Sequence, residues 1–118
     1  MRPMSPRALA YDAAVSEAQR LMAASNPAAA ITLLERAHVL GQREIGRHLR
    51  VHLLMLRAAW VLRDSRELRG QLLRLALTPI GHLSGRLPLG NTGASNVSPF
   101  EPIALPPDLE RLLRDEER

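Results

Sequence analysis

The sequence of 118 residues contains no cysteine, no lysine and only three aromatic side chains, Tyr11, Trp60 and Phe100. Without cysteine, the chain cannot be a disulfide-stapled secreted scaffold, a zinc ribbon or an enzyme with a thiol nucleophile. With so few aromatic residues, leucine, alanine and valine must build the core. No run approaches the roughly 18 consecutive apolar residues of a membrane-spanning helix, and the first residues lack the apolar segment of a signal peptide. We therefore expect a cytoplasmic protein.

The positive charge is modest and consists entirely of arginine. Sixteen arginines against twelve acidic residues give a formal net charge of +4, and arginine beside abundant alanine and leucine is typical of a GC-rich coding bias. Arg43, Arg47, Arg50 and Arg57 form one stripe on an expected helix, but no aromatic residues accompany them for stacking on bases. A solvated helix face, or a contact with the acidic C-terminal tail, is favoured over nucleic-acid binding.

Four helices are expected in residues 1–78. Three of them begin with an N-cap residue, which proline follows in two cases: Ser5-Pro6, Asn26-Pro27 and Asp64-Ser65. The expected helices cover 6–22, 27–41, 43–63 and 65–78, with the last one ending at Thr78-Pro79. Short connections between them predict antiparallel neighbours.

The second expected helix carries Ala30, Leu34 and Ala37 at a small–large–small spacing similar to that of a tetratricopeptide repeat. We predict an all-α fold of two antiparallel, tetratricopeptide-like helical hairpins over residues 1–78. Two such units leave an open face, because stacked repeats need a cover at each end. Residues 79–118 are expected to cover this face within a single domain.

Residues 79–107 are rich in glycine and proline and are predicted to be non-helical. Because apolar residues recur along this segment, we expect an ordered arm that lies over the helices, with Trp60 and Phe100 as anchors. His82 would lie in this arm, either solvated or as a lid over a site, and a flexible tail is the alternative for the whole segment. A short amphipathic helix is expected over residues 108–114.

Histidine is concentrated at the turn between the second and third expected helices. His38 lies on the apolar stripe of the second helix with Glu35 beside it, and His48 and His52 are four residues apart on the third helix. Folding back at the turn brings these faces together. We therefore predict a transition-metal site formed by Glu35, His38, His48 and His52, and this ligand set suits zinc, iron, nickel, cobalt or copper. Met55 is a further, weak candidate ligand.

Two other interpretations of the histidines remain open. They can brace the core by hydrogen bonds to carbonyls or carboxylates, as in an interaction adaptor that holds a partner peptide in its helical concavity. One of them can also serve as a general acid or base. The chain has a single Glu-x-x-His unit, Glu35 to His38, and no His-Glu-x-x-His motif, so a mononuclear site is favoured and catalysis is not. Gly90-Asn91-Thr92-Gly93 predicts consecutive turns.

Three sequence blocks resemble one small bacterial family, the domain-of-unknown-function family numbered 3703. They are residues 34–42, the spacing His48-x-x-x-His52-x-x-Met55-Leu56, and residues 90–100 with their Gly-Asn-Thr-Gly start. The resemblance extends from about Ala8 to Leu113. It implies a stand-alone cytosolic helical protein without an assigned activity, whose recurring residues map onto Glu35, His38, Gln42, His48, His52 and the arm. Some members look like neighbours of metal-resistance determinants, which favours the metal hypothesis.

Overall fold

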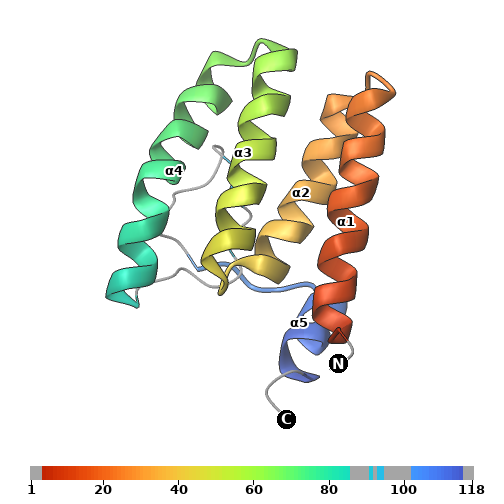
Figure 1. Ribbon diagram of the computed structural model, residues 1–118, viewed down its shortest axis with the longest axis vertical. Helices are drawn as coiled ribbons and strands as arrows, with labels where there is room; N and C mark the ends of the chain where they lie inside the picture. The colour runs from red at the N-terminus through yellow and green to blue at the C-terminus, as the bar shows by residue number, and fades with distance from the viewer. Residues whose placement is uncertain (1–3, 86–90, 92, 95–101, 116–118) are drawn as a thin grey trace.

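The structure is a computed structural model that describes residues 4–85, 91, 93–94 and 102–115, and all regular elements in these residues are helices. They are α1 (Pro6–Ala23), α2 (Pro27–Gly41), α3 (Ile45–Leu62), α4 (Ser65–Ser84) and α5 (Pro107–Asp115). The first four helices lie side by side in the order α1, α2, α3, α4, and each packs on its neighbour in sequence (Figure 1). The all-α prediction is confirmed.

The helix starts follow the capping signals of the sequence. The side chains of Ser5, Asn26 and Asp64 accept hydrogen bonds from backbone N–H groups in the first turns of α1, α2 and α4, at 3.1, 3.4 and 3.0 Å. These bonds satisfy N–H groups that have no partner within the helix. The predicted starts are therefore confirmed for these three helices.

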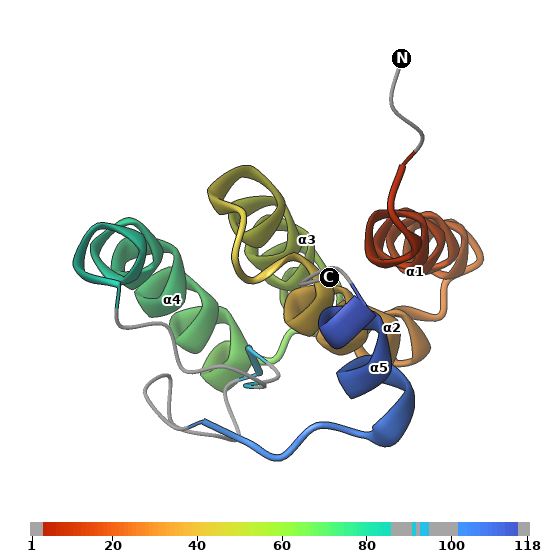
Figure 2. The ribbon, with the colours of Figure 1, turned by 90° about the horizontal axis from the view of Figure 1, so that it is seen from below.

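Helix α2 is the centre of the core, between α1 and α3. Ala30, Leu34 and Ala37 are all at most 1% exposed, and α5 packs on α2 and α1 from below (Figure 2). At the end of α2 the ring of Tyr11 lies so close to Gly41 that a Cβ there would come within 2.7 Å of it. Small residues thus allow the close approach of α1 to α2. The likeness to tetratricopeptide hairpins stays a prediction.

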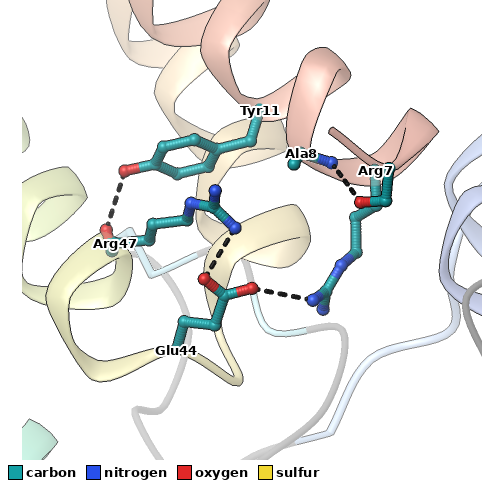
Figure 3. Close-up of polar contacts among 6 residues, drawn as sticks. Arg7, Ala8, Tyr11, Glu44 and Arg47 are labelled. Atoms are coloured by element: carbon teal, nitrogen blue, oxygen red, sulfur yellow. Dashed lines mark hydrogen bonds and ion pairs between the residues drawn. The ribbon is translucent and has the colours of Figure 1, made fainter. Parts of the chain in front are cut away.

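A polar clamp ties α1 to the beginning of α3. The Glu44 carboxylate accepts from Arg7 at 2.8 Å and from Arg47 at 2.6 Å, and the Tyr11 hydroxyl donates to the Arg47 carbonyl at 3.0 Å (Figure 3). Arg7 is buried, so its ion pair with Glu44 is screened less than a surface pair. The clamp fixes the first turn of α3, where His48 follows Arg47.

Three predictions about the arm and its anchors need correction. Helix α4 does not end at Thr78-Pro79 but continues through Pro79 to Ser84, and it ends at Gly85 with φ of 71°. A proline inside a helix removes one backbone hydrogen bond, and the remaining bonds keep the helix intact here. His82 therefore lies on α4 and not in the arm. Trp60 is 72% exposed, so it does not anchor the arm. Phe100 lies outside the described residues.

The described part of the arm supports an ordered cover. Asn91, Gly93 and Ala94 are buried against the helices, and α5 extends the prediction of 108–114 by one residue at each end. Leu109 is buried in the core cluster, with Leu105, Leu112 and Leu113 packed beside it. Arg36 of α2 pairs with Asp108 of α5 at 2.7 Å at the exposed edge of this contact. No described helix is long and apolar enough to cross a membrane.

Candidate metal centre

Three buried histidine rings meet between α2 and α3. His38 comes from α2, His48 and His52 come from successive turns of α3, and their ring centroids are 4.7–4.9 Å apart. The Nε2 atom of His38 lies 3.0 Å from Nε2 of His48 and 3.2 Å from Nε2 of His52. One nitrogen from each ring belongs to a group of atoms that all lie within 4.8 Å of one another. The structure thus brings together the three histidines that the helical spacing predicted to converge.

The other nitrogen of each ring is held by a second residue. His38 Nδ1 lies 2.6 Å from the carbonyl oxygen of Asn91, and His52 Nδ1 lies 2.7 Å from Oε1 of Gln71. His48 Nδ1 lies 3.0 Å from Nε2 of His82. All three rings are therefore oriented with Nδ1 outward to a partner and Nε2 inward to the other rings.

These partners determine where His38 and His52 carry their hydrogen. A backbone carbonyl only accepts, so His38 Nδ1 is the protonated nitrogen of a neutral ring. The amide nitrogen of Gln71 donates to Glu67 Oε1 at 2.8 Å and to the Gly93 carbonyl at 2.7 Å, which turns its oxygen toward His52. His52 Nδ1 is therefore also protonated. Both Nε2 atoms then carry lone pairs that face each other.

Facing lone pairs at 3.2 Å are unfavourable unless a positive charge or a donor lies between them. A hydrogen on His48 Nε2 can be directed at His38, but among the contacts of the described residues His52 Nε2 then has no donor. A metal ion satisfies all three nitrogens at once. For an ion held tetrahedrally at about 2.0–2.1 Å, neighbouring ligand nitrogens lie about 3.3–3.4 Å apart, close to the observed distances. Two of the three Nε2 separations are therefore close to this value, and because the ligand atoms all lie within 4.8 Å of one another, a rearrangement of the rings would bring all three onto one ion.

Burial keeps the three rings neutral. Burial lowers the pKa of His48 to about 3 and that of His52 to about 4, and it also lowers the pKa of His38 well below its usual range. The neighbouring histidines contribute to the low pKa values of His38 and His48. The charge of Arg74 on α4 lowers the pKa values of His38 and His52 further. Metal ions bind the neutral imidazole, so these rings need not lose a proton to solvent at neutral pH.

The arm lies against the metal centre at a glycine, Gly93. Gly93 has φ of 80°, its N–H donates to the Asn91 side chain at 2.9 Å, and a Cβ on it would come within 2.6 Å of the His38 ring. Only glycine combines this backbone conformation with such a close approach. Gly90 and Thr92 lie outside the described residues, so the turns expected for Gly90-Asn91-Thr92-Gly93 stay a prediction, while the backbone of Gly93 lies directly on His38.

The other predicted site residues, Glu35 and Met55, have surroundings that differ from those of the three histidines. Glu35 is partly buried on α2 but is not in the group of converging donor atoms; burial and the nearby charge of Glu67 raise its pKa. Glu35 as a ligand stays a prediction. Met55 is fully buried in the apolar core cluster.

Sequence reasoning missed the residues that support the histidines from α4. Gln71, Arg74 and Thr78 are the buried residues of this helix, and all are polar. Their spacing of three and four residues places them on one helix face. A polar stripe on the inward face of an otherwise leucine-rich helix was the available signal that this face meets a polar site.

A family model described as "Protein of unknown function (DUF3703)" matches residues 6–113. The chain belongs to this family. The match covers all the residues of the histidine centre in this DUF3703 protein, including the buried part of the arm, and it confirms the resemblance seen in the sequence. Searches of curated proteins and of solved structures each find no significant match.

Proposed function

We propose that this DUF3703 protein binds one transition-metal ion through the Nε2 atoms of His38, His48 and His52. The observation that carries the proposal is the arrangement of the rings. Three neutral imidazoles direct Nε2 inward, with His38 Nε2 3.0 Å from that of His48 and 3.2 Å from that of His52, while each Nδ1 is held by a partner. Metal-binding histidines characteristically use one nitrogen for the ion and the other for such an orienting bond.

Glu35 is the candidate fourth ligand. It lies one turn before His38 on α2. Its partial burial raises the pKa of its carboxyl group, and a metal ion there would compensate the negative charge. Zinc, iron, nickel, cobalt and copper all accept imidazole and carboxylate ligands, and the absence of thiolate disfavours copper(I). Replacement of Glu35 by glutamine is expected to weaken binding while leaving the histidine ligands in place.

A role in metal buffering, sensing or resistance fits this site better than catalysis. The rings are 2–5% exposed, and the arm backbone lies directly against His38. A buried ion with protein ligands suits storage or signalling, whereas a catalytic ion keeps a position open to substrate. The cytoplasmic location expected from the sequence is part of this proposal.

Metal analysis of protein purified without a histidine tag tests the proposal. The wild type is expected to bind one zinc or cobalt ion per chain, and His52→Ala is expected to lose it. Arg50→Ala, an exposed position on the same helix, is the matched control. Circular dichroism of each variant verifies the fold. If wild type and His52→Ala hold equally negligible metal after titration with zinc, cobalt and nickel, the proposal is wrong.

A second candidate function is that of a protein-interaction adaptor. Exposed apolar side chains on α3 and α4 favour it, most clearly Trp60, Ile80 and Leu83, which are 60–90% exposed. If the histidines only brace the core, a chelator leaves the melting temperature unchanged. A partner would then be lost on Trp60→Ser, and tryptophan fluorescence would report its binding to the wild type.

A further inference from the structure

His82 extends the histidine cluster from the buried centre toward solvent. Its Nε2 atom lies 3.0 Å from His48 Nδ1, on the side of the His48 ring opposite the inward-facing Nε2. His82 is only partly buried, whereas His38, His48 and His52 are buried. The four rings thus form a continuous series in which His48 is in contact with both the inner nitrogens and the outer histidine.

The outer pair of nitrogens has the same spacing as the inner set. His48 Nδ1 and His82 Nε2 are 3.0 Å apart, and the inner Nε2 atoms are 3.0 and 3.2 Å apart. Two imidazole nitrogens at this distance match neighbouring ligands of a single ion. Because His82 is partly exposed, water can supply the remaining ligands at this position.

The tautomer of His48 links the two positions. Without an ion, His48 satisfies His38 when its hydrogen is on Nε2, and this tautomer leaves the Nδ1 lone pair facing His82. With an ion on the inner nitrogens, His48 carries its hydrogen on Nδ1 and donates it to His82 Nε2. His48 therefore shifts its hydrogen from Nε2 to Nδ1 as the ion moves inward, and His82 shifts its hydrogen from Nε2 to Nδ1. Both shifts exchange protons with water, so no proton is gained or lost overall.

We propose that His48 Nδ1 and His82 Nε2 form an outer metal-binding pair, through which a divalent transition-metal ion reaches the inner histidines. This inference rests on the proposed function, since it assigns the route by which the inner site is loaded. The outer pair is an intermediate position, where two protein ligands bind the ion weakly before it moves to the three inner histidine ligands.

Stopped-flow uptake of cobalt, followed by its absorption, tests the route. His82→Gln keeps an oxygen that accepts from His48 Nδ1 but lacks the imidazole ligand. We expect uptake and release both to slow by about tenfold, with an equilibrium Kd close to that of the wild type. Leu83→Gln, at the adjacent and 90% exposed position, is the matched control and is expected to keep wild-type rates.

Two outcomes separate the outer pair from simpler roles. If His82→Gln takes up cobalt at the wild-type rate, the outer pair is wrong although the inner site stands. If His82→Ala weakens binding by about 10–100-fold through faster release alone, and His82→Gln restores it, His82 only orients His48 and the route is overturned. If the wild type binds no cobalt, zinc or nickel, the proposed function and the route both fail.

A second measurement does not depend on the inner site. His38→Ala/His52→Ala removes two inner ligands and leaves the outer pair. We expect weak binding of one zinc ion to this variant by calorimetry, and its loss when His82→Ala is added. Equal zinc binding in the double and triple variants contradicts the outer pair. Should the double variant lose its helical circular dichroism, the His82→Gln rates decide.

Discussion

Replacement of Gly93 by alanine tests how closely the arm and the histidine centre depend on each other. An alanine at φ of 80° costs about 1–2 kcal/mol in backbone strain, and its Cβ would lie 2.6 Å from a His38 ring atom. The ring is held at both ends, by Asn91 on one side and by the other histidines on the other, so we expect the arm to move instead. Its displacement breaks the bonds from His38 to the Asn91 carbonyl and from Gln71 to the Gly93 carbonyl.

The size of the effect follows from these losses. Two buried hydrogen bonds at about 0.5–1.5 kcal/mol each, added to the strain, give a loss of about 2–5 kcal/mol in the free energy of unfolding. Metal affinity is expected to fall by about 10–100-fold, because His38 loses its orienting partner. Urea unfolding without metal and a zinc competition titration measure the two effects separately.

Gly85 provides a matched control for the strain alone. It has φ of 71°, and apart from its chain neighbours and its own helix backbone, no described residue has an atom within 4 Å of the position that a Cβ would take. In Gly85→Ala, the free energy of unfolding should therefore fall only by the backbone strain of about 1–2 kcal/mol, and the metal affinity should equal that of the wild type. If Gly93→Ala is no more destabilising than Gly85→Ala and binds zinc equally well, the contact between arm and His38 does not have the role assigned to it.

Three further predictions concern stability. Gly46→Ala in α3, where a Cβ would meet no atom of the other described parts of the chain within 4 Å, should raise the free energy of unfolding in urea by about 0.5–1 kcal/mol, and a loss would contradict the open space there. Tyr11→Phe removes the bond to the Arg47 carbonyl and should cost about 1 kcal/mol in the same assay; no cost would show that the bond contributes nothing. Without metal, stability should fall as pH drops from about 6.5 to 4, because the unfolded chain binds protons there while His52, with a pKa of about 4, and His48, with a pKa of about 3, stay neutral in the fold. The expected slope is about 1.4 kcal/mol per pH unit for each histidine, and a flat profile between pH 6.5 and 5 would contradict their burial.

The predictable features of the fold are those that local sequence determines. N-cap residues and periodicity located the helices, and the spacing of His48 and His52 placed both on the face toward α2. The turn after α2 is short, which made the convergence with His38 a consequence of helix geometry. The all-α class, and the convergence of three of the four proposed ligands, could thus be predicted from the sequence alone.

Long-range contacts explain what was missed. Gln71 reaches His52 from α4, and the Asn91 carbonyl reaches His38 across 53 positions of the chain. No local pattern encodes such a pairing. Pro79 favours a helix end because its ring removes a backbone hydrogen bond, yet α4 continues beyond it to Ser84. The scarcity of aromatic residues favours Trp60 as an anchor of the arm, yet its position on α3 faces solvent.

The central claim is that three imidazole nitrogens of one chain hold a single metal ion, and X-ray absorption at the zinc edge of the loaded protein tests it most directly. The account predicts a first shell of nitrogen and oxygen at about 2.0–2.1 Å with the multiple scattering of three histidine rings. His82→Gln should give the same spectrum, since His82 is not an inner ligand. A spectrum of a hydrated zinc ion without histidine scattering would contradict the account.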